Sequence, residues 1–379
     1  MNQMTKLPPS NARRALVLQG GGALGAYQAG VYEALTEAGF RPEWIAGVSI
    51  GAINAAIIAG NPPAERMTAL RTFWEQVSVS LPIELPFGNE QMRAFVSNAS
   101  AAWVASFGVS GFFRPRLPPP FLMPQGSEGA ISYYDTEPLK ATLERLVDFK
   151  RINSKETRLS LGAVNVQTGT LHYFDNMNHE IGPEHVMASG ALPPGFPPVE
   201  IDGQYYWDGG VVSNTPLEYV LEENLHDDLL VFQVDLFKRE GPLPRTMLDV
   251  MERLKDIQYA SRTVHNTKAS LEVHEARMAL RGLLMALPEE LRNDPNAKLL
   301  EKCADERTVT VAQVIYRNKP YEGSSKDYEF SRQAMREHWQ AGLADVAHCM
   351  QKHKQTLNQR PQATATQVVE AGRQESIAA

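Results

Sequence analysis

The sequence predicts an α/β fold with a largely parallel sheet, because strands and helices alternate from its beginning. Apolar strands are expected at residues 15–19 and 44–48. Small and apolar residues at helical spacing predict helices at 26–38 and 50–59, and Gly39 provides a stop for the first helix. The order strand, helix, strand, helix is typical of a parallel sheet whose crossovers are helical.

The composition indicates a folded globular chain and excludes several classes of protein. Of the 379 residues, 43% are hydrophobic and 21% are charged, unlike disordered or collagen-like chains. A net charge of −7 argues against a nucleic-acid-binding protein, which needs a positive surface for phosphates. Cys303 and Cys349 lack ligand spacing, so neither a disulfide framework nor a metal site is indicated, and no cofactor is expected.

The middle of the chain continues the α/β pattern after an unusual insertion. Residues 81–130 interleave prolines and phenylalanines with Gly and Ser, which predicts an irregular excursion. Two interpretations have equal weight: a lid over the site, or a segment packed on the sheet. Beyond it, regular elements are expected as a helix at 136–149 and strands at 159–166 and 229–236.

Two turns in this region carry specific local signals. Asp202 and Gly203 form a type I′ turn signal between two half-apolar strands, so a hairpin is predicted over residues 199–207. Thr215, Pro216 and Glu218 have the pattern of an N-cap, a first helical residue and a capping box, and they predict a helix start.

The last third of the chain is expected to be mainly helical. Residues 241–350 contain one late strand at 309–316 and a helix at 327–348. An apolar stripe of Met247, Val250, Met251, Leu254 and Ile257 is interpreted as core or oligomer contact rather than as a membrane face. Residues 351–379 are polar and charged, so a disordered tail is predicted.

The chain is expected to be cytoplasmic. Residues 1–13 contain no apolar run followed by a cleavage site, so they do not resemble a secretory signal. The longest weakly polar stretch, residues 46–60, is shorter than the roughly 20 apolar residues of a membrane-spanning helix. Peripheral membrane contact and a homo-oligomer both stay open.

A glycine-rich loop follows the first strand, and it has two interpretations. Residues 20–25 read Gly-Gly-Gly-Ala-Leu-Gly and match the dinucleotide fingerprint between a strand and a helix. That fingerprint also requires an acidic residue after the second strand, whereas Glu43 precedes that strand. A nucleotide-binding oxidoreductase is therefore the minor alternative. The other interpretation is an anion pocket made by backbone amides.

The second strand ends in the pattern of a nucleophile elbow. Gly47-Val48-Ser49-Ile50-Gly51 is G-x-S-x-G, in which two glycines leave room for a sharp turn that exposes the serine. Ser49 is also a plausible N-cap for the following helix. The amides of Gly21, Gly22 and Ala23 favour the functional interpretation, because a serine beside an anion pocket is typical of acyl transfer.

A base for this serine is not obvious among the histidines. His226 precedes a strand, and His265 and His274 lie in predicted helix, so each is more simply a surface or partly buried histidine. Asp208, in Asp208-Gly209-Gly210, is the alternative candidate, although such a tripeptide is also a common turn.

Four segments in order resemble the patatin-like phospholipase family. They are the glycine loop at residues 20–25, the elbow at 47–51, the run at 188–198, and Asp208-Gly209-Gly210 with Asn214 and Pro216. The resemblance implies a three-layer α/β/α catalytic domain over residues 14–240, with residues 241–350 as a C-terminal extension seen on a bacterial subgroup.

The resemblance also implies roles for these residues. Ser49 would be the nucleophile and Asp208 its base, without histidine, while Gly20, Gly21, Gly22 and Ala23 would form the oxyanion hole. An ordinary aspartate, with a pKa near 3.9, is a weak base at neutral pH, so most of the rate would come from the oxyanion hole.

The implied activity is a serine acyl hydrolase that cleaves lipid esters through an acyl-enzyme. One departure concerns residue 24, where many members carry Arg or Lys and this chain has Leu24, which puts a preference for phospholipids in doubt. The alternatives are an esterase for non-membrane esters, such as lysophospholipids or storage polyester fragments, and a lipid-binding protein with a dead site.

Overall fold

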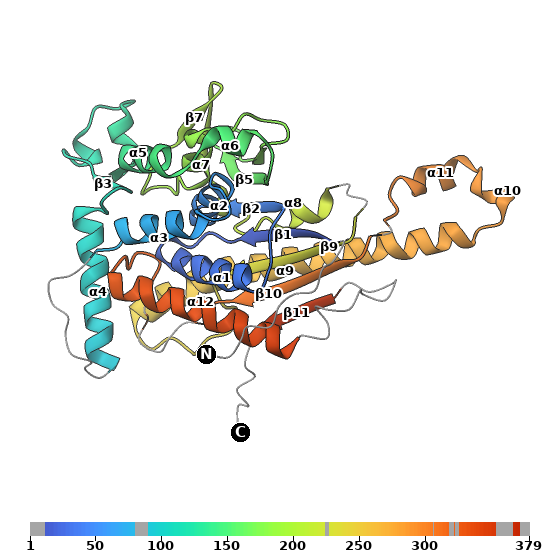
Figure 1. Cartoon of the computed structure of the whole chain (residues 1–379). Helices are drawn as coiled ribbons and strands as arrows, with labels where there is room; N and C mark the ends of the chain where they lie inside the picture. The colour runs from blue at the N-terminus through green and yellow to red at the C-terminus, as the bar shows by residue number, and fades with distance from the viewer. Residues whose placement is uncertain are drawn as a thin grey trace.

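A computed structural model describes residues 12–79, 90–223, 227–305, 307–317, 322, 326–353 and 367–371 (Figure 1). Its centre is one sheet of nine strands in the order β11-β10-β9-β1-β2-β5-β8-β7, with β6 also paired to β5. The strands are β1 (Arg13–Leu18), β2 (Trp44–Val48), β5 (Arg158–Asn165), β6 (Leu171–Asp175), β7 (Val199–Ile201), β8 (Gln204–Asp208), β9 (Leu229–Asp235), β10 (Val309–Ile315) and β11 (Gln367–Ala371).

The sheet is mostly parallel. All pairs from β11 to β5 along that order are parallel, whereas β6 and β8 run antiparallel to β5, and β7 to β8. The carboxyl ends of β1 and β2 therefore meet at one edge of the sheet, which is where ligands of parallel sheets bind.

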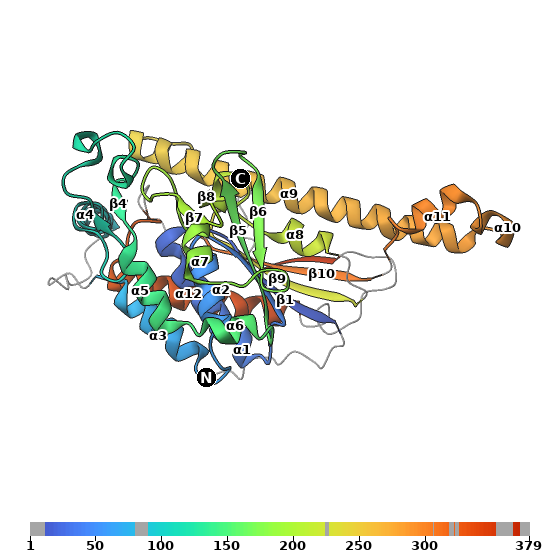
Figure 2. The same cartoon turned by 90° about the horizontal axis from the view of Figure 1, so that it is seen from above.

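Helices cover both faces of the sheet and produce three layers (Figure 2). The long α9 and the short α8 lie on one face, and α1, α2 and α12 lie on the other. The alternation of β1 explains this arrangement: Leu16 joins the core on the α1 face, while Ala15 and Val17 join the core on the α8 face. The predicted three-layer fold with a mostly parallel sheet is confirmed.

The helices begin and end as follows: α1 (Gly25–Glu37), α2 (Ile50–Ala59), α3 (Arg66–Gln76), α4 (Glu90–Phe107), α5 (Glu137–Leu146), α6 (Phe149–Asn153), α7 (Pro183–Ser189), α8 (Leu217–Glu222), α9 (Met247–Ala286), α10 (Glu289–Arg292), α11 (Pro295–Glu301) and α12 (Arg332–Lys352). A small two-stranded sheet, β3 (Arg114–Pro115) with β4 (Tyr134–Asp135), lies outside the main sheet.

Two local predictions have opposite outcomes. The hairpin is confirmed, because Asp202 and Gly203 both have positive φ and connect β7 to β8. The capping box is wrong: α8 begins at Leu217, and the Thr215 hydroxyl bonds instead to Thr263 of α9 at 2.9 Å. A tertiary partner thus replaces the local cap.

The excursion at residues 81–130 is more regular than predicted. Residues 80–89 lie outside the described part of the chain, but residues 90–107 form α4. The reason is that residues 92–107 contain neither Gly nor Pro, and the prolines that suggested irregularity begin at Pro115.

The segment after residue 240 is partly built into the main fold. β10 pairs with β9 inside the central sheet, and α12 packs along α1, so this segment completes the domain and is not a separate body. The far part of α9, with α10 and α11, projects away from the sheet (Figure 1). We call this projection the arm.

The apolar stripe of α9 does not pack in a core. Its five side chains, from Met247 to Ile257, are all exposed, whereas the face toward the protein carries polar and charged residues such as Asp256 and Thr263. The interpretation of this stripe as core is therefore wrong.

The predicted disordered tail also differs from the structure at one place. Residues 367–371 form β11, which pairs in parallel with β10 at the edge of the sheet. An open strand edge offers unpaired backbone groups, and the two adjacent valines of this segment favour a strand. Among the helices of the described residues, none is long and apolar enough to cross a bilayer.

Candidate active site

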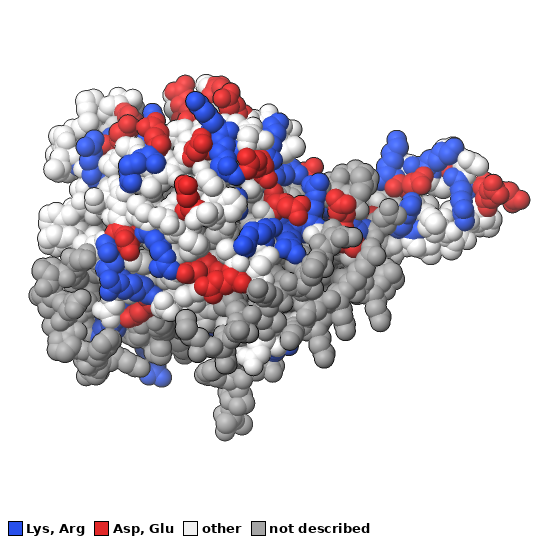
Figure 3. Space-filling model, viewed as in Figure 1, with Lys and Arg blue, Asp and Glu red and all other residues white. Residues whose placement is uncertain are grey.

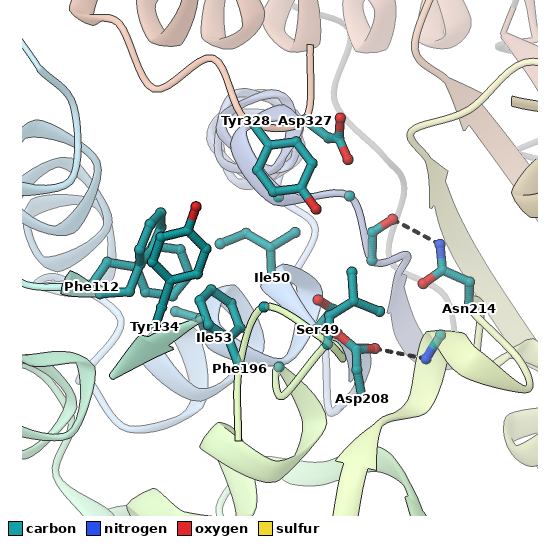
Figure 4. A pocket seen from close by; sticks show the side chains of 18 of the residues that line it. Ser49, Ile50, Ile53, Phe112, Tyr134, Phe196, Asp208, Asn214, Asp327 and Tyr328 are labelled. Atoms are coloured by element: carbon teal, nitrogen blue, oxygen red, sulfur yellow. Dashed lines mark hydrogen bonds between the residues drawn. The ribbon is translucent and has the colours of Figure 1, made fainter. Parts of the chain in front are cut away.

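The candidate site lies where β1 and β2 end. The glycine loop follows β1, Ser49 follows β2, and Asp208 is the last residue of β8. These segments border a cavity of about 360 Å³ (Figure 4). Its volume lies in the range of small-molecule sites.

Ser49 occupies a strained turn. Its φ of 57° and ψ of −126° are rare for a residue with a side chain, and they point the hydroxyl into the cavity at the start of α2. A Cβ on Gly47 would lie 2.4 Å from the carbonyl oxygen of Gly51, and one on Gly51 would lie 2.3 Å from that of Leu18. Both glycines of the elbow are therefore required sterically.

The backbone beside Ser49 is fixed by α7. The Ser49 amide donates to the carbonyl and to the hydroxyl oxygen of Ser189, at 3.0 and 3.1 Å. The Ser189 hydroxyl in turn donates to the carbonyl of Gly162 in β5 at 2.6 Å. The strained turn is thus held by two neighbouring elements, and Ser189 is a residue that sequence reasoning did not identify.

Asp208 is buried beside Ser49. Its Oδ1 accepts a hydrogen bond from the Gly210 amide at 2.7 Å, while its Oδ2 has no hydrogen-bond partner among the described residues. Burial raises the pKa of this carboxyl to about 7, although the nearby Ser49 hydroxyl and the Gly210 amide favour the ionised form and lower it in part. The ordinary value near 3.9 therefore does not describe Asp208, whose burial the sequence does not show.

The glycine loop has fewer free amides than predicted. Gly20 donates to the carbonyl of Asn214 at 3.1 Å, and Ala23 donates to the carbonyl of Asp327 at 2.9 Å. Within the described residues, the amides of Gly21 and Gly22 donate no hydrogen bond. Of the four predicted oxyanion-hole residues, Gly21 and Gly22 are therefore the two whose backbone amides are available to bind an oxyanion.

Gly22 is held against the C-terminal segment. Its φ of 56° is left-handed, and a Cβ there would lie 2.2 Å from the carbonyl oxygen of Asp327. The Asp327 carboxylate is paired with Lys255 of α9 at 2.8 Å, and the neighbouring Lys326 with Asp256 at 2.6 Å. The predicted helix at 327–348 begins instead at Arg332, because residues 326–330 lie over the site.

The rest of the cavity wall is apolar and aromatic. Ile50 and Ile53 of α2 face Phe112, Tyr134 and Phe196 across it (Figure 4). The rings of Phe113 and Tyr134 pack edge-on with 4.8 Å between centroids, and those of Phe113 and Phe196 pack at a tilt with 5.3 Å between centroids. This wall suits a hydrocarbon chain.

No cationic side chain from the described residues lines the cavity, and no histidine does. Leu24, where a cation was considered, is buried in the core. His226, one of the histidines weighed as a base, lies outside the described residues. The described residues also contain no group of three His, Cys, Asp or Glu side chains that could hold a metal ion.

Comparison with solved structures gives distant similarities. The chain is similar to VipD from Legionella pneumophila, with 14% identity, 90% of this chain and 70% of that chain covered, and a TM-score of 0.35. It is also similar to ExoU of Pseudomonas aeruginosa in complex with SpcU, with 14% identity, coverages of 78% and 60%, and a TM-score of 0.29. No individual curated protein matches the chain at a significant level.

Family models give a direct assignment. The model of the patatin-like phospholipases matches residues 16–221, which include Ser49 and Asp208. A second model, described as patatin phospholipase, matches residues 257–363. The two matches cover both the glycine loop and the C-terminal segment that packs on it. The chain belongs to the patatin-like phospholipase family and is a lipid acyl ester hydrolase.

Proposed function

We propose that Ser49 and Asp208 form a catalytic dyad that cleaves lipid esters through an acyl-enzyme. The observation that carries this proposal is the strained elbow, which puts the Ser49 hydroxyl beside a buried carboxyl whose Oδ2 is open. Strain of this kind persists where the surrounding structure enforces it, as Ser189 does here.

The reaction has two halves. Asp208 accepts the proton of Ser49 while the serine Oγ bonds to the ester carbonyl carbon, and the carbonyl oxygen becomes an oxyanion. The amides of Gly21 and Gly22 donate to that oxyanion. When the tetrahedral intermediate collapses, Asp208 returns the proton to the leaving alcohol; water then repeats the sequence and releases the fatty acid.

The raised pKa of Asp208 suits this role. A base with a pKa of about 7 is about half ionised at neutral pH, and it takes up a proton far more readily than an ordinary aspartate. General base catalysis of this type contributes roughly 10²–10⁴ in rate, and each oxyanion donor roughly 10²–10³. The contribution of the base is thus comparable to that of a single amide donor.

The lining of the cavity indicates the class of substrate. The wall between Ile53 and Phe196 suits an acyl chain, whereas the cavity lining of the described residues offers no cation for an anionic headgroup. We therefore propose neutral or zwitterionic lipid esters as substrates. An esterase for non-membrane esters uses the same dyad, and a panel of soluble esters, lysophospholipids and phospholipids separates the two.

Covalent labelling tests the dyad. A fluorophosphonate probe should label the wild type and the Ser106→Ala variant, which changes an exposed serine on α4, but not the Ser49→Ala variant. The same three proteins should be assayed on p-nitrophenyl esters of increasing chain length. A folded wild type that neither reacts with the probe nor hydrolyses any ester would instead support the non-catalytic lipid-binding alternative.

A further inference from the structure

An exposed apolar surface surrounds one side of the cavity mouth. It is made by the end of α4 and by the loop between β3 and β4, and we call it the mouth patch: Trp103, Phe107, Leu117, Phe121, Leu122 and Ile131. We propose that the mouth patch docks the protein on a zwitterionic lipid surface. This inference rests on the proposed function, because it names the surface from which that site would draw its substrate.

The loop side chains are exposed to an unusual degree. Leu117, Phe121 and Leu122 are 86%, 84% and 75% exposed, so they contribute almost nothing to the core. Single exposed apolar residues are ordinary on protein surfaces, but several together mark an interaction site. These three lie within six consecutive residues of the loop between β3 and β4.

The surface is also nearly free of charge. Residues 94–113 and 117–127 contain no Asp, Glu, Lys or Arg. The two arginines beside the loop are neutralised: Arg114 pairs with Asp135 at 2.7 Å, and Arg116 with Glu128 at 2.9 Å. In the space-filling view, the outer margin at the upper left is white, and the charged side chains just inside it include both signs (Figure 3).

The mouth patch is continuous with the wall of the cavity. Tyr133 lines the cavity, and its ring lies 6.1 Å from that of Phe121. Ala105 of α4 lines it as well, and its carbonyl accepts a hydrogen bond from the Tyr134 hydroxyl at 2.9 Å. The mouth patch therefore adjoins residues of the cavity wall, on the loop side through Tyr133 and on the α4 side through Ala105.

This continuity favours lipid over a protein partner. A lipid surface pressed against the loop leaves the path to the cavity filled by hydrocarbon, so an acyl chain enters without crossing water. A second copy of the chain on the same surface would cover the mouth. The net charge of −7 and the paired arginines argue against attraction to anionic lipids, so the contact is apolar.

Vesicle binding tests the inference independently of catalysis. The full chain with Ser49→Ala should co-sediment with phosphatidylcholine vesicles, with little dependence on salt. Adding Leu117→Ser, Phe121→Ser and Leu122→Ser should weaken binding at least about tenfold, because three large apolar side chains are lost from the contact. Unchanged binding by this mouth variant would overturn the proposal.

Two further variants control for general loss of apolar surface, and the first of them matches the mouth variant in the number of substitutions. The arm variant carries Leu283→Ser, Leu291→Ser and Leu299→Ser, three exposed leucines at the opposite end of the molecule (Figure 1). The stripe variant carries Met251→Ser and Leu254→Ser on α9. Both should keep their affinity within about twofold. If only the stripe variant loses vesicle binding, the contact lies on α9. If the mouth variant converts a dimer to a monomer, the patch is a protein interface. Either result contradicts the proposal.

Activity assays with Ser49 intact separate this inference from the proposed function. The mouth variant should hydrolyse a short soluble ester at the wild-type rate and should lose activity on vesicles. A wild type that binds vesicles but hydrolyses no ester would refute the dyad and leave the docking surface standing. A mouth variant that is as active on vesicles as the wild type would refute the docking surface alone.

Discussion

Gly20 and Asn214 are joined by two hydrogen bonds in opposite directions, although 194 residues separate them. The Gly20 amide donates to the Asn214 carbonyl at 3.1 Å, and the Asn214 side chain donates to the Gly20 carbonyl at 2.9 Å. This pair connects the glycine loop after β1 to the segment that follows Asp208. It thereby fixes the distance between the amides of Gly21 and Gly22 and the carboxyl of Asp208.

We expect Asn214→Ala to lower both stability and activity. The Gly20 carbonyl loses its donor in a buried place, which should reduce the free energy of unfolding by about 1–3 kcal/mol. The loop then shifts relative to Ser49, and a shift of this kind lowers kcat on the order of 10²-fold. Urea unfolding and steady-state kinetics measure the two effects, with exposed Asn178→Ala as the control. Wild-type kcat in the Asn214→Ala variant would show that the pair is not needed for alignment.

The pH dependence of activity should report the ionisation of Asp208. The carboxyl must be ionised to accept the proton of Ser49, and burial raises its pKa to about 7. We therefore expect kcat/KM to rise with pH and to level off above about pH 7, with on the order of a hundredfold loss at pH 5. A profile that is flat between pH 5 and 8 would mean that a different group is the base.

The same pKa predicts how stability changes with pH. The folded protein keeps the Asp208 proton up to about pH 7, whereas the unfolded chain loses it near pH 3.8, so this group stabilises the fold less as pH rises between these values. Asparagine stays neutral throughout. The stability of Asp208→Asn relative to the wild type should therefore increase from pH 4 to pH 8, by up to roughly 4 kcal/mol. Urea unfolding at the two pH values measures the difference, and an equal difference at both would contradict the raised pKa.

Local motifs made part of this site predictable. The elbow around Ser49 and the turn at Asp202 depend on a few adjacent residues, and the structure contains both. The pKa of Asp208 depends on burial by elements from distant parts of the chain. The placement of Asp327 over Gly22 depends on ion pairs to α9, so periodicity alone assigned it to a helix. Long-range packing, and not local propensity, determined what the sequence did not predict.

The Gly22→Ala variant should measure the contribution of the oxyanion hole to the rate separately from that of Ser49 and Asp208. An added Cβ meets the Asp327 carbonyl at 2.2 Å in a left-handed backbone, so the loop must move. We expect a loss of roughly 10²–10³ in kcat, as for removal of one oxyanion donor, while fluorophosphonate labelling of Ser49 slows but persists. Gly203→Ala, which also changes a glycine of positive φ but in open space on the hairpin, is the control. Equal kcat values for the two variants would exclude the glycine loop from the chemistry.

The final prediction concerns Lys326, which connects the C-terminal segment to α9. Its buried ammonium contacts Asp256 at 2.6 Å and Glu252 at 3.4 Å, next to the residue that holds the glycine loop. Lys326→Met removes the cation from the buried Asp256 carboxylate, and such losses cost about 3–5 kcal/mol of stability. Kcat should fall as well, because Asp327 no longer holds Ala23 in place.

A second substitution distinguishes the charge from the shape of this contact. Lys326→Met combined with Asp256→Asn removes the uncompensated charge, so thermal unfolding should show recovery of much of the lost stability. Kcat should recover with it if the ion pair acts on the site by fixing residues 326–328. Recovery of stability without recovery of kcat would mean that the lysine itself is needed to hold the glycine loop in its active shape. No recovery of either would mean that Asp256 does not carry the contact.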